Sequence, residues 1–284
     1  MDTAFFSGLN TEVGGTAARA ELAGTVDSAP ACGGPWSPEL QHGGPPGALL
    51  VRLAEQLAAA AAGRDDLVSV RIAAEFLAPV PVAPLAVSAR VLRLARSAVL
   101  VSAELTADDR PCLQARVWLM PANRAAAGPP ADESDAAGPG AEEGEPVAED
   151  PSERPDFGMD GFPYAEHLEW RVVSGEARRP GPATTWARAR VPLLAGERLS
   201  TLQRLVLVAD SASGISSLLD WDDWSFANVD LDVHLMRQSR DDWVLMQATS
   251  QLGAGLGLAR SLLSDRAGLL GAGLQTLLIR SRRD

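Results

Sequence analysis

The chain has 284 residues, 46% of them hydrophobic, so it is long enough for one large or two small domains with real cores. Its net charge is −12, and −9 of this lies between Arg124 and Asp160, where eleven acidic residues stand against two arginines. The remainder is nearly neutral and offers no basic surface for phosphate groups, which argues against nucleic-acid binding.

The amino-terminal sequence MDTAFFSGLN has no basic segment followed by an apolar run, and no uninterrupted apolar segment reaches about 18 residues. We therefore expect a cytoplasmic protein that neither enters nor binds a membrane. Cys32 and Cys112 are too few for a disulfide framework, and the three histidines, His42, His167 and His234, lack the spacing of metal ligands. We expect no metal and no cofactor.

The first 120 residues predict strands around one buried helix. Short alternating segments within Thr3–Val26, clearest at Ala17–Ala23, indicate a hairpin of half-buried strands. Pro46 then opens a helix that runs to about Ala62 and is apolar on all but one narrow face, so other structure must enclose it. Four segments of strand length and composition follow: Val68–Leu77, Leu85–Leu94, Ala98–Ala107 and Pro111–Met120.

Residues 124–160 are rich in Ala, Gly, Pro and acids and show no apolar periodicity. Such a segment cannot bury enough surface to offset the entropy of ordering it, so we interpret it as a disordered linker. An acidic docking segment is the alternative interpretation.

The same order of elements follows the linker. Phe162–Val172 and Thr184–Pro192 predict strands, Thr201–Leu219 predicts a helix, and four more strands are expected. These are Phe226–Met236, Trp243–Gln251, Leu256–Ser264 and Leu269–Arg280. The repeated order predicts a duplicated unit of the α+β class, in which an antiparallel sheet wraps a central helix twice.

This plan, together with several motifs, resembles the acyl-CoA thioesterase II type family, whose members are double hotdogs. The motifs are Trp36-Ser-Pro-Glu-Leu-Gln-His-Gly-Gly-Pro-Pro-Gly47, Glu75-Phe-Leu-Ala-Pro-Val-Pro81, Ala209-Asp-Ser-Ala-Ser-Gly214, Phe226-Ala-Asn-Val-Asp-Leu-Asp-Val-His234, and Gln275 in the last strand. The resemblance implies an N-terminal hotdog at 1–123 and a C-terminal hotdog at 161–284 that carries the active site.

Asp210 lies at the margin of the apolar face of the second predicted helix, where it should be partly buried. A carboxylate there is either a solvated helix residue or a tuned base. The resemblance implies the second: Asp210, Asn228 and Gln275 would hold and activate the water that attacks an acyl-CoA or acyl-carrier thioester. The family often has threonine or serine where this chain has Asn228.

Two further segments carry candidate residues. His42, Gly43 and Gly44 precede the first helix, and their glycines permit either close approach of a ligand or a tight loop. Alternation along Asn228–Leu235 predicts that Asn228, Asp230, Asp232 and His234 share one face, which is either solvated or contains an Asp232–His234 acid/base pair.

Two alternatives to thioester hydrolysis remain open. Hotdog hydratases add water to an enoyl thioester with an adjacent Asp and His, and the sequence places no histidine near Asp210. A non-catalytic acyl-thioester-binding protein is consistent with the departure at Asn228. Exposed sheet edges would favour association of double-hotdog units into a homo-oligomer.

Overall fold

The computed structural model describes residues 3–122, 150–253 and 255–282, which form two units of matching element order. In the first unit, two strands precede the long helix α1 and four follow it. Its elements are β1 Phe6–Gly14, β2 Glu21–Ser28, α1 Gly44–Ala62, β3 Leu67–Phe76, β4 Pro84–Leu94, β5 Val99–Ala107 and β6 Arg110–Pro121. Short helical turns occupy Ala17–Arg19 and Pro30–Cys32.

The second unit repeats the order, with its central helix and its third strand each divided in two. It contains a turn at Pro151–Glu153, then α2 Pro163–Glu166, β7 Leu168–Ser174, β8 Ala183–Ala189, α3 Thr201–Ala209, α4 Ala212–Ile215, β9 Trp224–Asn228, β10 Asp230–Leu235, β11 Val244–Gly253, β12 Leu256–Asp265 and β13 Gly268–Ser281.

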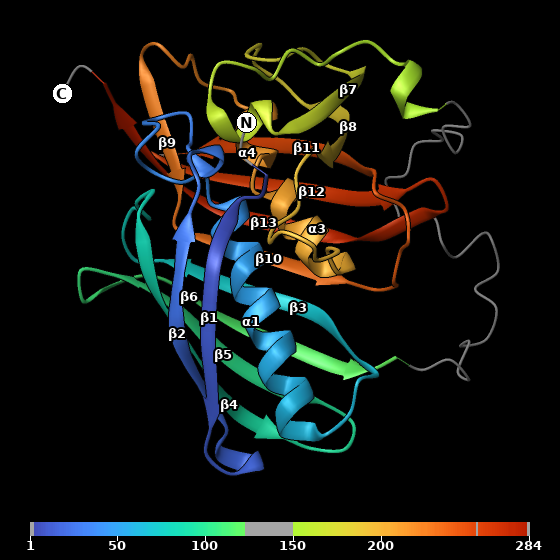
Figure 1. The fold of residues 1–284 in the computed structure, drawn as a ribbon. Coiled ribbons are helices and arrows are strands. Elements are labelled where there is room, and N and C mark those ends of the chain that lie inside the picture. The colour runs from blue at the N-terminus through green and yellow to red at the C-terminus, as the bar shows by residue number, and fades with distance from the viewer. Residues whose placement is uncertain (1–2, 123–149, 254, 283–284) are drawn as a thin grey trace.

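The strands of both units join in one antiparallel sheet, because β3 of the first unit pairs with β10 of the second. The strand order is β1-β2-β4-β5-β6-β3-β10-β13-β12-β11-β8-β7, so the second unit repeats the first in reverse, and β9 pairs with β13 beside this path. Helix α1 crosses the strands of its unit, while α3 and α4 cross those of theirs (Figure 1). This is the expected double-hotdog arrangement.

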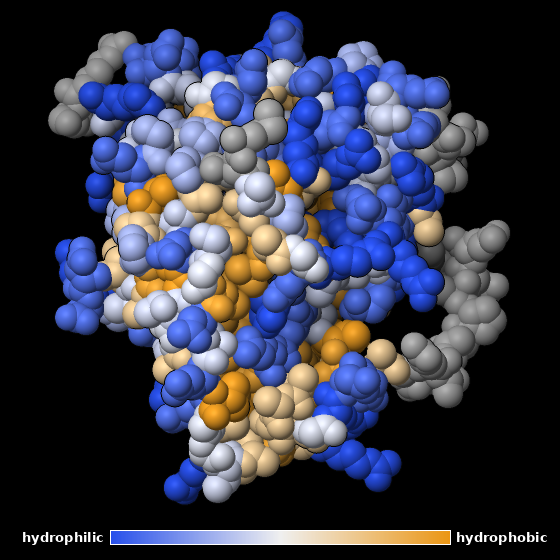
Figure 2. Space-filling view, in the orientation of Figure 1, coloured by the Kyte–Doolittle hydropathy of each residue, from blue (hydrophilic) through white to orange (hydrophobic). Residues whose placement is uncertain are grey.

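The hydrophobic pattern of α1 explains its position. Leucines 49, 50, 53 and 57 are fully buried, as expected for a helix that other structure encloses. Gly63 ends the helix in the left-handed conformation, with φ of 61°, and its N–H donates to the carbonyl of Ala59. Apolar side chains reach the surface mainly over the middle of the face shown in Figure 2, with polar ones around them.

The second predicted helix is broken at Asp210, because a side chain from the last strand enters its hydrogen-bond ladder. In a continuous helix the N–H of Ser213 would donate to the carbonyl of Ala209, but here it donates to Oε1 of Gln275 at 3.2 Å. Gln275 Nε2 donates to the carbonyl oxygen of Asp210 at 3.1 Å. Asp210 therefore lies at the end of α3, not in the middle of a helix.

The predicted strand Phe226–Met236 is divided at Val229, and the division reverses the side on which Asn228 lies. Asp232 pairs with the outward-facing Leu274, whereas Asn228 pairs with the buried Leu277. The register of pairing with β13 shifts by one residue between these two pairs, and such a shift is a β-bulge. The prediction that Asn228 shares a face with Asp230, Asp232 and His234 is therefore wrong for Asn228.

Part of the segment interpreted as a disordered linker is ordered. Residues 150–160 run beside β7, where the N–H of Val172 donates to the carbonyl of Pro155 and the N–H of Phe157 donates to that of Trp170. Phe157 and Met159 are buried, so apolar side chains anchor a stretch that composition alone marked as unstructured. The rest of the interpretation concerns residues 124–149, which lie outside the described residues.

Two strand boundaries also differ from expectation. Ala17–Arg19 forms a helical turn within the first hairpin, so that strand begins at Glu21 and not at Ala17. Pro163 begins a short helix, which delays the predicted strand at Phe162 to Leu168. Strands β1 and β7 form the two ends of the sheet, and association of chains through these edges stays a prediction.

Candidate functional site

Asp210 ends α3 and is 5% exposed, and it faces the amino-terminal end of α1. The two helices meet closely because α1 begins with glycines. A Cβ on Gly44 would lie 2.5 Å from the carbonyl oxygen of Leu207, and one on Gly43 would lie 2.9 Å from Oδ1 of Asp210. These glycines therefore allow α1 to pack closely against α3, and binding of a ligand at Gly43 and Gly44 stays a prediction.

The structure brings the three predicted catalytic side chains together. Asn228 Nδ2 donates to Oδ1 of Asp210 at 2.8 Å, because the bulge after β9 turns this amide inward. Gln275 Nε2 lies 3.4 Å from the same oxygen and is bound more closely to the Asp210 backbone. Gln275 is 1% exposed, so it supports Asp210 from within the core.

His42 is the fourth member of this cluster. Its Nδ1 lies 2.9 Å from Oδ2 of Asp210, and its side chain is 11% exposed. The sequence argument that no histidine lies near Asp210 is therefore wrong. It failed because the His42 loop precedes α1 and the contact crosses between the two units.

The backbone N–H of Gly44 lies 3.2 Å from Nδ1 of His42, so two groups approach the same ring nitrogen. Only one of these contacts can be a hydrogen bond at a time. When Asp210 is ionised, Nδ1 of His42 carries a hydrogen and donates it to Oδ2. The Gly44 N–H then donates to the carboxylate and not to Nδ1.

The pKa of the Asp210 carboxyl lies below its ordinary value as the result of opposing effects. Burial raises it, but the charge and hydrogen bond of His42, the amide of Asn228 and the backbone N–H of Gly44 lower it by more. Asp210 therefore remains a carboxylate at neutral pH although it is buried.

Tyr164 from α2 fixes the His42 ring. The two rings stack with centroids 3.7 Å apart and planes 4° apart. The Tyr164 hydroxyl donates to the carbonyl of Leu207 at 2.5 Å and lies 3.1 Å from Oγ of Ser211. Burial raises the pKa of this phenol far above its ordinary value, so it stays neutral. Tyr164 was not expected from the sequence, where it is a single tyrosine after the acidic segment.

A pocket of about 530 Å³ opens beside the cluster. His42, Gly43, Asp210 and Asn228 contribute to its wall, and most of the other lining residues are apolar. These include Phe76, Leu77, Val80, Met159, Phe162 and Leu278. A mainly apolar pocket with a few convergent polar groups is the usual form of a small-molecule site.

Three aromatic rings form one end of the pocket. The centroid of the Trp36 ring lies 5.5 Å from the centroid of the Trp221 ring and 5.2 Å from that of the Phe226 ring. The guanidinium of Arg282 sits 5.1 Å from the Trp36 ring. Trp36 begins the motif that contains His42, so the motif supplies both a pocket wall and a polar group.

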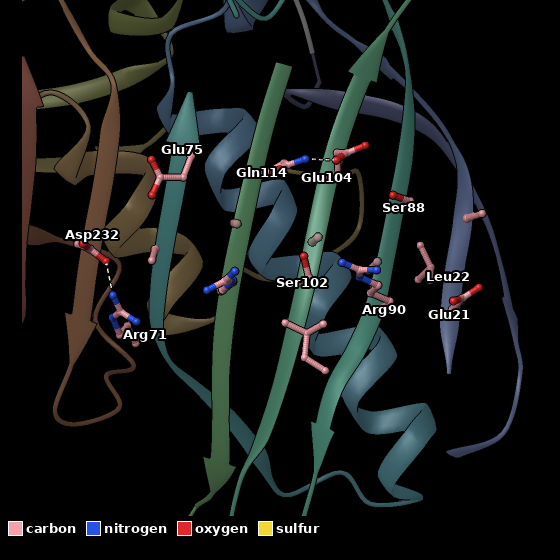
Figure 3. A pocket seen from close by; sticks show the side chains of 17 residues that line it. Glu21, Leu22, Arg71, Glu75, Ser88, Arg90, Ser102, Glu104, Gln114 and Asp232 are labelled. Carbon is pink, nitrogen blue, oxygen red and sulfur yellow. Dashed lines mark hydrogen bonds and ion pairs between the residues drawn. The ribbon is translucent and has the colours of Figure 1, made fainter. Parts of the chain in front are cut away.

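A second hollow, of about 870 Å³, lies on the outer face of the sheet and contains none of the cluster (Figure 3). Two pairs of its polar side chains are in contact: Arg71 Nη2 donates to Asp232 at 2.8 Å, and Gln114 donates to Glu104. His234 is exposed on the outer face of β10. Asp232 thus forms an ion pair with Arg71 and not the suggested pair with His234, and it lies outside the pocket beside Asp210.

Glu55 on α1 is placed much as Asp210 is on α3. It faces the first turn of α3, where Gln203 Nε2 donates to it, and it accepts a hydrogen bond of 2.5 Å from Ser69 on β3. Burial raises the pKa of Glu55, with smaller opposing effects from Ser69, Ser200, Gln203 and Arg52. Asp210 is therefore not the only helix acid that turns toward the core, but Glu55 does not line the pocket.

Across residues 3–122, 150–253 and 255–282 there is no group of three or more His, Cys, Asp or Glu side chains that could hold a metal ion. No helix in the same ranges is long and apolar enough to cross a membrane. Cys32 and Cys112 are both buried.

Family models match both units of the chain. Residues 33–120 match the acyl-CoA thioesterase N-terminal domain, and residues 141–279 match the acyl-CoA thioesterase C-terminal domain. Together these matches cover most of the chain. No curated protein sequence matches it significantly.

Solved structures share the fold at low sequence identity. A hot dog fold protein of unknown function from Alicyclobacillus acidocaldarius superposes with a TM-score of 0.68 and 15% identity, over 95% of this chain and 96% of that one. The tesB protein of Mycobacterium avium subsp. paratuberculosis superposes with a TM-score of 0.64 and 17% identity, over 95% of this chain and 96% of that one. The acyl-CoA thioesterase II TesB2 of Mycobacterium marinum superposes with a TM-score of 0.59 and 16% identity, over the same shares of the two chains. These likenesses confirm the double-hotdog fold.

Proposed function

Because this chain belongs to the acyl-CoA thioesterase family, with both the N-terminal and the C-terminal domain, we propose that it hydrolyses an acyl-CoA thioester in the pocket beside Asp210. The observation that carries the proposal is a buried carboxylate, in contact with His42 and Asn228, in the wall of an apolar pocket. A buried, ionised group with specific partners in a pocket is typical of a catalytic site.

In this proposal the negative charge of Asp210 activates a water molecule for direct attack on the thioester carbonyl. No covalent intermediate with the enzyme forms. Asn228 and Gln275 hold the carboxylate, since both side-chain amides direct an N–H toward Oδ1. Activation of this kind contributes about 10²–10⁴-fold, which suits a thioester because its carbonyl is more electrophilic than that of an amide.

The pocket wall has features that suit the acyl chain and the carbonyl group of such a substrate. Apolar side chains such as Phe76 and Leu278 would cover the acyl chain and exclude bulk water from the reacting carbon. The backbone N–H of Gly43, which precedes α1 and lies in the pocket wall, would stabilise the oxyanion that develops on the carbonyl.

Release of free thiol from a panel of acyl-CoAs of increasing chain length tests the proposal, with the wild type compared with Asp210→Asn. We expect the variant to lose about 10²–10⁴-fold in kcat. Asp232→Asn is the matched control, because Asp232 lies on the outer face of the sheet. Unchanged turnover in Asp210→Asn would show that hydrolysis does not take place beside Asp210. Tight binding of an acyl-CoA without release of thiol by the wild type would indicate a binding protein.

Hydration of an enoyl thioester is a second candidate, and the contact of His42 with Asp210 is the observation that favours it. Such a hydratase needs one group to activate water and one to protonate the α-carbon. Loss of the crotonyl-CoA absorbance without release of thiol would identify this reaction.

A further inference from the structure

His42 is the member of the cluster best placed to exchange a proton with a ligand. Its Nδ1 edge faces Asp210 and one face of its ring is covered by Tyr164. The ring lines the pocket, and within the described ranges no protein group forms a hydrogen bond with Nε2. Nε2 is thus the part of the ring that is available to a ligand.

Asp210, in contrast, already has its oxygens occupied. A carboxylate can accept about four hydrogen bonds. Oδ1 faces Nδ2 of Asn228 at 2.8 Å and Nε2 of Gln275 at 3.4 Å, and Oδ2 faces Nδ1 of His42. The Gly44 amide also acts on the carboxylate. All four partners donate, so they stabilise the anion and leave little room for a water that would give it a proton.

We propose that His42 is the proton carrier of the hydrolysis, with Nε2 taking a proton from the attacking water and later giving it to the leaving sulfur. Asp210 is then the positioning residue that holds the ring with Nδ1 protonated. This proposal rests on the proposed thioester hydrolysis and names the atom through which the charge of Asp210 acts.

The steps balance without another reactant. As Nε2 removes one hydrogen from water, the water oxygen bonds to the carbonyl carbon and the carbonyl oxygen becomes an oxyanion. The oxyanion then reforms the double bond, the carbon–sulfur bond breaks, and the sulfur takes the proton from Nε2. The products are a carboxylic acid and a thiol, and His42 and Asp210 return to their starting protonation states.

The titratable groups that the structure places against the His42 ring are Asp210 from α3 and Tyr164 from α2. Tyr164 stays neutral, as described above, so Asp210 is the charged neighbour. Histidine side chains change charge between about pH 5 and 8. If Asp210 took the proton directly, activity would persist well below the pH range in which histidines change charge, because the pKa of Asp210 is lowered.

The test compares the pH dependence of kcat/KM in the wild type and in His42→Asn. Asparagine keeps an N–H donor close to the place of Nδ1, so it preserves the contact with Asp210 but removes Nε2. We expect kcat to fall by about 10²–10⁴-fold with little change in KM, and kcat/KM to lose the acid-side decline that a histidine base produces.

Two further variants separate this role from a structural one. His42→Ala should regain part of its activity on addition of imidazole, which a purely structural ring would not explain, and thermal unfolding reports whether each variant folds. His234→Asn is the matched control, because His234 is exposed on the outer face of β10.

The outcomes are distinct. If His42→Asn kept activity within about threefold while Asp210→Asn lost it, the hydrolysis would stand and the proton-carrier role would be overturned. If the wild type released no thiol from any acyl-CoA, the proposed function and this inference would both fail.

Discussion

Replacement of Gly43 by alanine tests whether the helix ends really meet as closely as the site requires. Gly43 has φ of −68° and ψ of −17°, which alanine adopts without strain, so any effect is steric. The added Cβ would lie 2.6 Å from Cζ and 2.8 Å from Cε1 of Phe76, and 2.9 Å from Oδ1 of Asp210. Carbon atoms in good contact are about 3.5–4.0 Å apart, so the overlap is close to 1 Å.

Relief of this overlap must move either the Phe76 ring or the start of α1. Overpacking of this kind costs about 1–3 kcal/mol of folding stability. Movement of α1 would shift the glycine amides relative to Asp210, and a misplacement of about 1 Å can reduce turnover about 10²-fold. We therefore expect Gly43→Ala to lower both the free energy of unfolding and the rate of thiol release.

Urea unfolding and thiol release measure the two effects separately. Gly14→Ala is the control, because a Cβ at Gly14 would have no neighbour within 4 Å. If Gly43→Ala matched the wild type in both measurements, the close packing of α1 against Asp210 and Phe76 would be refuted.

Three other changes probe the buried polar groups. Burial raises the folded-state pKa of Glu55, so the contribution of Glu55 to stability is largest at low pH and is lost as the pH rises through that pKa. Urea unfolding should therefore show that Glu55→Gln gains most in free energy of unfolding over the wild type at neutral pH. Asn228→Asp would set a second carboxyl group against Oδ1 of Asp210; the group at position 228, as the less stabilised of the two, then holds the shared proton, so activity should fall as the pH is raised and this proton is lost, which a pH–rate profile would show. Tyr164→Phe would remove the hydroxyl donor of the Leu207 carbonyl and should lower the free energy of unfolding by about 1–3 kcal/mol, while the ring that stacks on His42 remains. Equal stability at all pH values for Glu55→Gln, an unchanged profile for Asn228→Asp, or unchanged stability for Tyr164→Phe would contradict these expectations.

The sequence by itself determined the duplicated order of elements and the buried helix α1. Hydrophobic periodicity is a local property, and each strand or helix had to bury the face that its own pattern makes apolar. The glycines before α1 and the acid of the second helix also marked the residues that meet in the candidate site. Nearly all strands therefore lie within a few residues of their predicted positions.

Composition was a poorer guide after the acidic segment. Residues 150–160 lack periodicity, yet Phe157 and Met159 are buried against the second unit. A few large apolar side chains are enough to anchor a strand edge, and a compositional average over the whole segment does not detect them.

The site itself was decided by tertiary contacts between residues far apart in the sequence. The side chain of Gln275 breaks the helix at Asp210, and a bulge turns Asn228 from the outer to the inner face. The start of α1 brings His42 from the other unit to the same carboxylate. Local patterns specify which face of an element is apolar, but hydrogen bonds across elements determine which polar groups meet, and only the folded chain contains those bonds.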